Sequence, residues 1–236
     1  HNLGFTKANQ YSLSYTFLSS VNTFRAEIYY DDLFDVPVQK DIMSSYSLLN
    51  EQENFNNVPL VNSGTGKNYG IDMSFQKFFT AKYYCLLSGS LYDAKYKGSD
   101  GVKHDSRFNG NYAFSATGGY ETKKEITEKR KTRTTGFNLH VIYNGGYNES
   151  PVDESLSSAL GHTVYNEQNS FSKKLKDYFR VDARIVLRKN KSKKSQQWAL
   201  DIQNITGNEN EQYHYFDSVK KQTLIKKQLG LIPILS

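Results

Sequence analysis

Apolar and polar side chains alternate along much of this chain with a period of two residues. In the clearest stretch, residues 178–188, five apolar residues share one side of an extended chain: Phe179, Val181, Ala183, Ile185 and Leu187. Arg180, Asp182, Arg184 and Arg188 occupy the other side, and only Val186 interrupts the pattern. Alternation of this kind indicates a β-strand with one apolar and one polar face.

The same alternation elsewhere predicts an all-β chain with nine antiparallel strands. We place them at residues 10–18, 23–31, 66–79, 83–97, 110–124, 133–147, 178–190, 195–206 and 222–236. Helical periodicity is almost absent, and one helical turn at most is expected, at Ser155–Leu160. The sequence contains 18 Tyr and 14 Phe, which agrees with this assignment because aromatic side chains pack well on a pleated surface.

The predicted connections alternate strictly between short and long. The short ones are Ser19–Asn22, Thr80–Lys82, Glu125–Thr132 and Lys191–Lys194. The long ones are Asp32–Gly64, Lys97–Asn109, Asn144–Asp177 and Gly207–Lys221. Successive connections of an antiparallel sheet lie at opposite ends, so all long connections would lie at one end. This arrangement is typical of outer-membrane β-barrels, which have short periplasmic turns and long extracellular loops.

Composition excludes several other classes of protein. No stretch approaches the eighteen or so apolar residues of a membrane helix, but a barrel stays possible because only alternate strand residues face lipid. The single Cys85 forbids an internal disulfide. The net charge is +6, with basic clusters at Lys129–Arg133 and Arg188–Lys194. Since no recognition helix or aromatic RNA-binding motif accompanies them, we interpret these clusters as solvated turns and expect no nucleic-acid partner.

Five segments resemble a known family when they are taken in their order and spacing. They are Ser63–Asp72 (SGTGKNYGID), Leu87–Tyr96, Arg107–Tyr112, Asp177–Asp182 and Trp198–Thr206. Together they resemble the TonB-dependent outer-membrane receptors of Bacteroidetes-type bacteria, and the resemblance spans nearly the whole chain. In that family the last motif ends in N-x-x-N, whereas here Gly207 precedes Asn208.

The resemblance implies an antiparallel up-and-down transmembrane β-barrel of 22 strands around a plug. Residues 1–236 would supply the last nine strands, with the plug and the N-terminal strands absent. The location implied is the outer membrane of a Gram-negative bacterium. The partners implied are outer-membrane lipid, the plug, the remaining barrel strands and the TonB complex. Such barrels usually finish on an aromatic residue, so the ending Leu231–Ser236 is interpreted as several residues short.

The function implied is TonB-driven uptake of a large nutrient such as a siderophore, a glycan or a peptide, without enzymatic activity and without a cofactor. Ligand capture is expected at aromatic residues of the long loops: Tyr46, Phe55, Tyr165, Tyr213, Tyr215 and Phe216. Polar residues on the polar strand faces are expected to line the lumen or pair across strands: Arg180, Asp182, Arg184, Arg188, Asp201 and His140.

Aromatic residues near strand ends suit the interfacial girdles of a barrel: Phe78, Phe79, Tyr83, Tyr84, Tyr92, Tyr96, Tyr143 and Tyr147. The histidines are scattered, and no pair has zinc-ligand spacing. Two alternatives remain open from the residues alone. One is a soluble all-β, lectin-like binding module, and the other is a small closed porin or enzyme barrel. A soluble sandwich would bury Ile71, Leu139, Val181 and Ile185 against a second protein layer.

Overall fold

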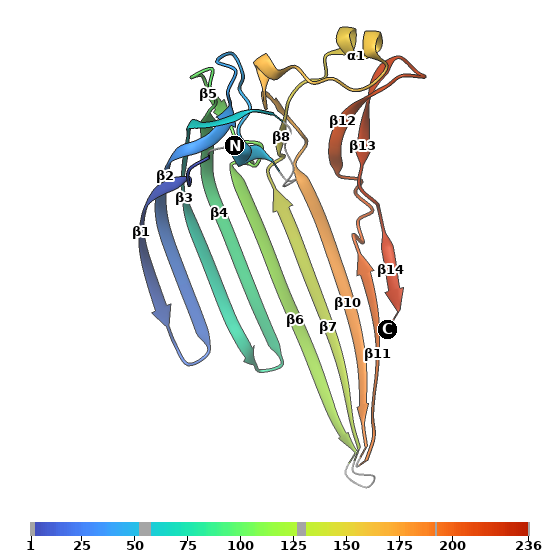
Figure 1. Cartoon of the computed structure of the whole chain (residues 1–236). Coiled ribbons are helices and arrows are strands. Elements are labelled where there is room, and N and C mark those ends of the chain that lie inside the picture. Colours follow the sequence, from blue (N-terminus) through green and yellow to red (C-terminus); the bar gives the residue numbers. More distant parts are fainter. Residues whose placement is uncertain (1–2, 52–57, 127–130, 192, 236) are drawn as a thin grey trace.

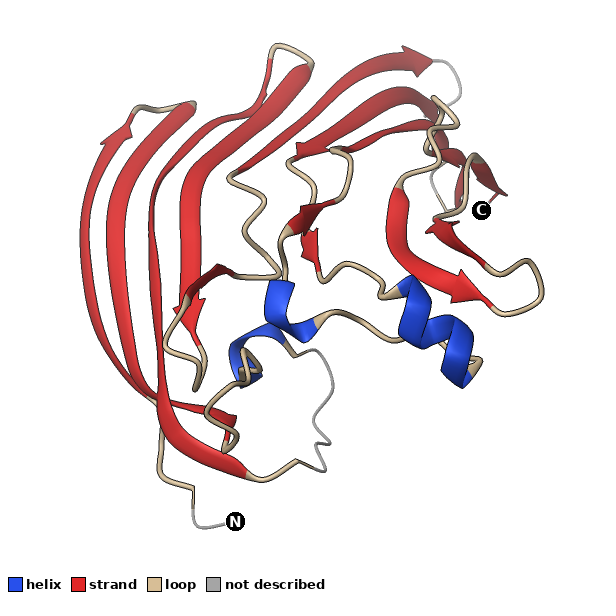
Figure 2. Ribbon diagram, turned by 90° about the horizontal axis from the view of Figure 1, so that it is seen from above, coloured by secondary structure: helices blue, strands red, loops and turns tan. Residues whose placement is uncertain are grey.

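The computed structural model describes residues 3–51, 58–126, 131–191 and 193–235. Nine strands follow one another in a single curved, antiparallel sheet, in the order β1-β2-β3-β4-β6-β7-β10-β11-β14 (Figures 1 and 2). Their bounds are β1 Lys7–Leu18, β2 Asn22–Gln39, β3 Leu60–Thr80, β4 Tyr83–Lys97, β6 Tyr112–Ile126, β7 Lys131–Asn144, β10 Tyr178–Asn190, β11 Ser195–Gln203 and β14 Ile232–Leu235.

The all-β, antiparallel, up-and-down architecture predicted from the sequence is therefore confirmed. The sheet is not closed as a barrel: within the part of the chain that the structure describes, β1 and β14 are its two edges and do not pair with each other. Most strand boundaries agree with the predicted ones to within a few residues, because the alternation that defines them is strong.

Connection lengths also agree with the prediction. Short turns join β1 to β2, β3 to β4, β6 to β7 and β10 to β11 at one end of the sheet, which is the lower end in Figure 1. The long connections gather at the other end. They carry η1 (Leu48–Asn50), β5 (Lys103–Asp105), β8 (Asn148–Glu149), α1 (Glu154–Leu160), η3 (Glu167–Asn169), β9 (Lys173–Lys174), β12 (Glu211–Asp217) and β13 (Gln222–Lys227).

The one α-helix among the described residues, α1, lies where one helical turn was expected. Its first turn is capped by Asp153, whose side chain accepts a hydrogen bond from the Leu156 amide at 2.9 Å. It ends at Gly161, which has the left-handed conformation (φ 74°) that glycine adopts without strain.

Two predicted elements are wrong. The strand predicted at 222–236 is two strands: β13 pairs with β12 in a separate hairpin, and β14 pairs with β11. The loop predicted at Asp32–Gly64 is shorter at both ends, because β2 and β3 stay paired as far as Gln39 and Leu60, with a bulge between Leu33 and Val36. Asp32, where the loop was predicted to begin, is directly opposite Lys67 in this paired region.

Buried apolar side chains are few and lie mainly where the long connections fold against the sheet. Val36, Val38 and Tyr96 are 0–2% exposed. Tyr96 of β4 packs against Phe171 of the β7–β10 connection, with 6.1 Å between ring centroids. The connections thus cover the concave side of the sheet near one end (Figure 2). Below that level the described sheet is one layer thick.

Candidate functional site

One face of the sheet carries a continuous apolar surface, here called the belt. Directly opposed residues of antiparallel strands point to the same face, so the pairing register traces rows across the sheet. One row crosses seven strands: Phe17, Phe24, Phe75, Leu87, Ala116, Val141 and Val181. A second lies nearer the short turns: Cys85, Gly118, Leu139, Ala183 and Ile202. A third follows: Tyr83, Tyr120, Phe137, Ile185 and Leu200.

The belt is uncovered. Ile71, Leu139 and Ile185 are 42%, 50% and 40% exposed, and no second layer of the described chain lies on them. They are three of the four residues that a soluble sandwich would bury, and Val181, the fourth, is half-buried. A large exposed apolar surface marks contact with a membrane or a partner.

The belt runs obliquely across the hydrogen-bonded rows. On β2 its apolar side chains run from Phe24 to Tyr30, and on β10 from Phe179 to Leu187. Relative to the hydrogen-bonded rows, the middle of the belt is displaced by about five residues along the strands between β2 and β10. These two strands are about five strand spacings apart. At ~3.4 Å per residue and ~4.8 Å per strand, this is a slope of roughly 35°. Strands of outer-membrane barrels tilt by about 35–45° against the membrane normal.

Aromatic rings line both ends of the belt. At the loop end, Tyr11, Tyr30 and Tyr69 form one row, and the Tyr69 hydroxyl donates to Asp93 at 2.8 Å. At the turn end lie Tyr120 and Trp198, which are 46% and 52% exposed.

Of the residues expected in such girdles, Tyr83 and Tyr143 lie on the belt face. Tyr84, Tyr92 and Tyr96 lie on the opposite face, because they occupy the even positions of β4, whereas Leu87 and Leu91 occupy odd positions.

The six polar residues expected to share one face do so, on the concave side. Arg180 Nε lies 2.7 Å from Asp182 Oδ1, and His140 Nδ1 lies 3.8 Å from Asp182 Oδ2. Arg184, also on β10, lies 3.3 Å from Asp201 of the neighbouring strand β11. Arg188 donates from Nε to Gln197 at 3.0 Å. Cross-strand pairing therefore satisfies much of this polar face.

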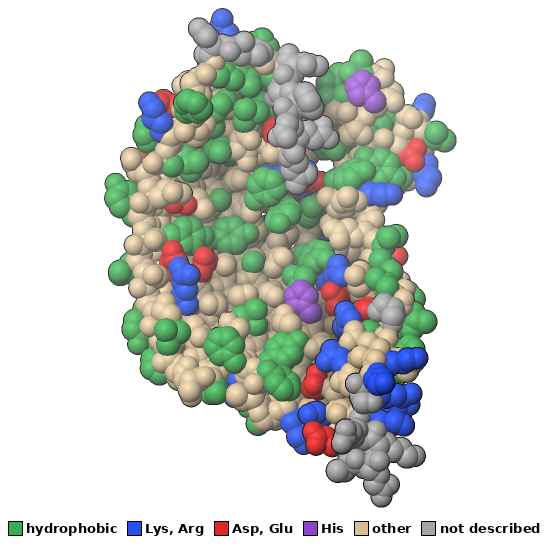
Figure 3. Space-filling view, turned by 60° about the horizontal axis from the view of Figure 1, so that its bottom comes forward, with side chains coloured by type: hydrophobic (Ala, Val, Ile, Leu, Met, Phe, Trp, Pro, Cys, Tyr) green, Lys and Arg blue, Asp and Glu red, His purple; other side chains and the backbone are tan. Residues whose placement is uncertain are grey.

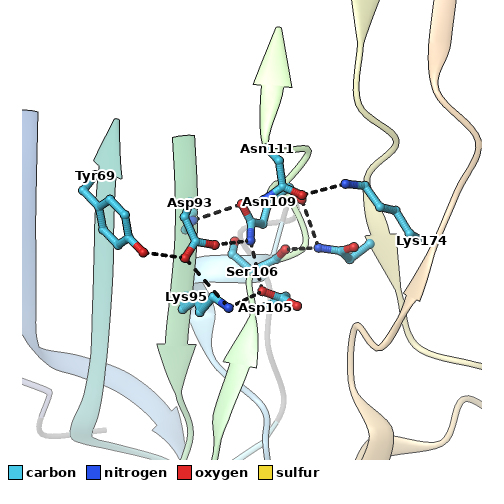
Figure 4. Close-up of polar contacts among 10 residues, drawn as sticks. Tyr69, Asp93, Lys95, Asp105, Ser106, Asn109, Asn111 and Lys174 are labelled. Atoms are coloured by element: carbon cyan, nitrogen blue, oxygen red, sulfur yellow. Dashed lines mark hydrogen bonds and ion pairs between the residues drawn. The ribbon is translucent and has the colours of Figure 1, made fainter. Parts of the chain in front are cut away.

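A polar network fixes the β4–β6 connection at the loop end (Figure 4). The side-chain amide of the buried Asn109 donates to Asp93 at 2.8 Å and to Asp105 at 3.0 Å, and its Oδ1 accepts from the Ala94 amide at 3.0 Å. Lys95 lies 3.8 Å from Asp93 and 3.4 Å from Asp105. Because every polar atom of the Asn109 amide has a partner, the connection is held firmly on the strands.

Between the long connections lies a cavity of about 940 Å³, here called the loop cavity. Aromatic rings form much of its wall: Tyr46, Tyr147, Tyr165, Phe171, Tyr178 and Tyr213. Charged and amide side chains complete it: Asn50, Glu51, Arg107, Asn144, Asn148, Glu149, Glu167, Lys176, Glu211, Gln212 and Gln228. Its volume lies near the upper end of the range for small-molecule sites, and the mixed lining can hold a polar ligand with apolar faces.

Three of the six aromatic residues predicted to capture a ligand line this cavity: Tyr46, Tyr165 and Tyr213. Tyr215 and Phe216 do not line it. Phe216 is buried (6% exposed), and the ring of Tyr215 lies edge-on against that of Tyr213, with 6.3 Å between ring centroids. Phe55 lies outside the described residues.

The electrostatics of the loop cavity are set by groups from four connections. Burial, followed by the carboxylate of Glu51, raises the pKa of Tyr46 to about 12, so its hydroxyl stays protonated at neutral pH. Lys176 lies 3.3 Å from Glu211. The guanidinium of Arg107 has no ion-pair partner within the described ranges, so it is available to an anionic group of a ligand.

Arg107, Tyr178 and Glu211 were not predicted as cavity residues. They belong to three parts of the chain, and no local spacing connects them. Arg107 and Tyr178 lie within two of the segments that carried the family resemblance, which was the one available signal. Sequence comparisons add no relative: no family model and no curated protein matches the chain.

No helix of the described chain is long and apolar enough to cross a membrane. Nor does any group of three or more His, Cys, Asp or Glu among the described residues have the arrangement of a metal site.

Proposed function

We propose that this chain is part of the wall of an outer-membrane receptor that takes up a large nutrient, such as a siderophore, a glycan or a peptide, driven by TonB. The belt faces the acyl chains, the concave polar face lines the lumen, and the long connections are extracellular. The chain acts as a transporter wall and capture surface, not as an enzyme.

The observation that carries the proposal is the uncovered belt. On β10 its apolar positions run from Phe179 to Leu187, about 27 Å along the strand and about 20 Å along the normal of a membrane against which the strand tilts by ~40°. This approaches the ~25 Å apolar band of outer-membrane barrels. A soluble, lectin-like sandwich would instead bury the same side chains against a second sheet.

The open edges fit the same proposal. Backbone N–H and C=O groups are left without a strand partner in the described sheet at two edges: the edge of β1 that faces away from β2, and the edge of β14 that faces away from β11. Each such group costs several kcal/mol in hydrocarbon, so strands cross a bilayer only in closed barrels. We therefore infer that further strands of the receptor complete the ring at both edges, around a plug that contacts the concave polar face.

The loop cavity is the proposed capture site. It lies on the extracellular side in this orientation, and its walls come from several connections held by buried hydrogen bonds, such as those of Asn109 and Asn148. Loops on a rigid scaffold commonly form binding sites. Stacking rings and amide groups then provide affinity without requiring covalent chemistry.

Spin labels on neighbouring residues of β7 test the membrane orientation. Leu139 points into the belt and His140 points to the concave face. Cys85 is replaced by Ser, and a spin label is attached at position 139 in one variant and at position 140 in another. Each labelled receptor is then placed in lipid vesicles. We expect the label at 139 to be relaxed by oxygen, which concentrates in lipid, and the label at 140 by a water-soluble nickel complex. Nickel relaxation of both labels would refute the proposal.

A further inference from the structure

Three cations lie side by side where the belt ends at the short turns. Lys124 of β6 is directly opposite Arg133 of β7, and Arg133 is directly opposite Lys189 of β10. All three point to the belt face, because each is an even number of residues away from a belt residue of its own strand. The pairs are Lys124 and Tyr120, Arg133 and Phe137, and Lys189 and Leu187. We call these three residues the basic row. Lys and Arg side chains gather at this end of the molecule in Figure 3.

The basic row has no counter-charge within the described ranges. None of its three cations lies in an ion pair, and the carboxylates on the same strand, Glu121 and Glu125, occupy odd positions of β6 that face the concave side. There Glu125 lies 2.8 Å from Lys123.

The opposite rim of the same face differs. At the loop end, Lys67 lies 3.9 Å from Asp32, and Lys95 lies 3.4 Å from Asp105. Lys67 and Lys95 are therefore neutralised by the chain itself. Lys97 and Lys103, which lie directly opposite each other at the same end, have no ion-pair partner within the described ranges.

Like charges directly opposite each other destabilise a sheet. A row of three is therefore best explained by an anion supplied from outside the described chain. The neighbours of the row indicate its environment. Leu187 and Trp198 are paired in the preceding row and are 47% and 52% exposed. Trp is enriched at the level of lipid headgroups, with its ring in the apolar region and its N–H near water.

We propose that the basic row binds the phosphate groups of anionic glycerophospholipids in the leaflet next to the short turns. The inference rests on the proposed function, since it requires the belt to face acyl chains. Adjacent strands are ~4.8 Å apart, so the row extends over about 10 Å, on the order of one or two headgroups. Guanidinium and ammonium groups at that spacing can share a phosphate between neighbouring strands.

Fluorescence of Trp198, the single Trp of the chain, reports on this site. The receptor is reconstituted in phosphatidylcholine vesicles that contain an equal fraction of brominated phosphatidylglycerol or brominated phosphatidylcholine. The Trp198→Phe variant supplies the background to subtract. We expect stronger quenching by the anionic probe at low ionic strength and a loss of this difference in 1 M salt.

Two substitutions at neighbouring positions provide the matched comparison. Lys124→Gln removes a cation from the basic row, and Lys123→Gln removes one from the concave face of the same strand. A cation near an anionic surface changes partitioning by roughly five-fold. We expect Lys124→Gln to lower the preference for the anionic probe several-fold, the triple variant Lys124→Gln/Arg133→Gln/Lys189→Gln to abolish it, and Lys123→Gln to preserve it.

The outcomes separate this inference from the proposed function. Equal quenching of the parent protein by both probes would refute the proposal that the basic row binds anionic lipid, but it would still agree with a belt that contacts lipid. An acidic protein partner of the basic row would give that result. Absence of quenching by either probe would show that Trp198 is away from lipid, and the proposed function would fail with the inference. Heat-modifiable migration in detergent checks that each variant is folded.

Discussion

The substitution Leu139→Arg distinguishes a membrane-facing belt from a surface exposed to water. Leu139 is 50% exposed, so about half of the ~1.5–3 kcal/mol gained by fully burying a leucine comes from its protein contacts. In water the substitution should therefore cost about 1 kcal/mol. At a bilayer midplane, arginine adds about 2–4 kcal/mol, and near the interface only about 0–1 kcal/mol.

Thr135→Arg is the control for depth. It lies on the same strand and face as Leu139, four residues closer to the short turns, which is about 10 Å along the membrane normal for a strand tilted by ~40°. The free energy of unfolding is measured by urea titration of the receptor in lipid vesicles, followed by fluorescence. We expect Leu139→Arg to lower it by at least 2 kcal/mol more than Thr135→Arg. Equal losses for the two variants, within about 0.5 kcal/mol, would refute the lipid-facing belt.

Three further predictions concern the loop end. Replacing Tyr165 or Tyr213 by Ala should weaken nutrient binding to the receptor by about 1–3 kcal/mol, measured by calorimetry, whereas Tyr15→Ala on the belt should leave it unchanged. The hydrogen bond from Tyr112, opposed by burial and reinforced by the amide of Gly146, lowers the pKa of Asp177. The ionised Asp177 therefore contributes its full stability above the ordinary pKa of about 3.9, and this contribution is lost as the pH falls below that value. We expect the protection of the Gly146 amide against hydrogen exchange to fall below about pH 4 in the parent protein and to stay constant in Asp177→Asn. In Gly145→Ala the new Cβ would lie 1.8 Å from the Gly110 carbonyl oxygen, so we expect faster proteolysis of the long connections, in contrast to Gly136→Ala, whose nearest contact is 3.9 Å.

The sequence predicted most of the sheet because side-chain alternation is a local property. Residues 178–188 have the faces assigned to them, with Phe179 and Ile185 on the belt and Asp182 on the concave side. The error at Tyr84, Tyr92 and Tyr96 was avoidable, since their even positions already separated them from the odd apolar positions of β4. Grouping aromatics by distance from a strand end ignored this alternation.

The remaining errors have non-local causes. The predicted loop began at Asp32, but β2 and β3 stay paired beyond this residue, and Asp32 lies 3.9 Å from Lys67 across the sheet. Asp35, at the bulge, has a left-handed backbone conformation (φ 57°) and lies 2.8 Å from Lys7. Residues 222–227 and 232–235 form two strands and not one because residues 222–227 pair with β12. The sequence of 222–236 does not itself indicate this partner. The loop cavity is the extreme case: Tyr46 and Tyr213 are brought together only by folding of the long connections.

The sheet has features that support the proposed apolar environment. Only five apolar residues of the described chain are buried: Val36, Val38, Tyr96, Ala199 and Phe216. Ordering each residue costs about 1–2 kcal/mol of conformational entropy, and so small a core in water cannot offset that cost. A second protein layer would supply the missing burial, but it gives no reason for a roughly 35° slope with aromatic rings at both ends. A bilayer accounts for all three features, because one planar slab determines the height of the belt, its slope across tilted strands and the position of its aromatic borders.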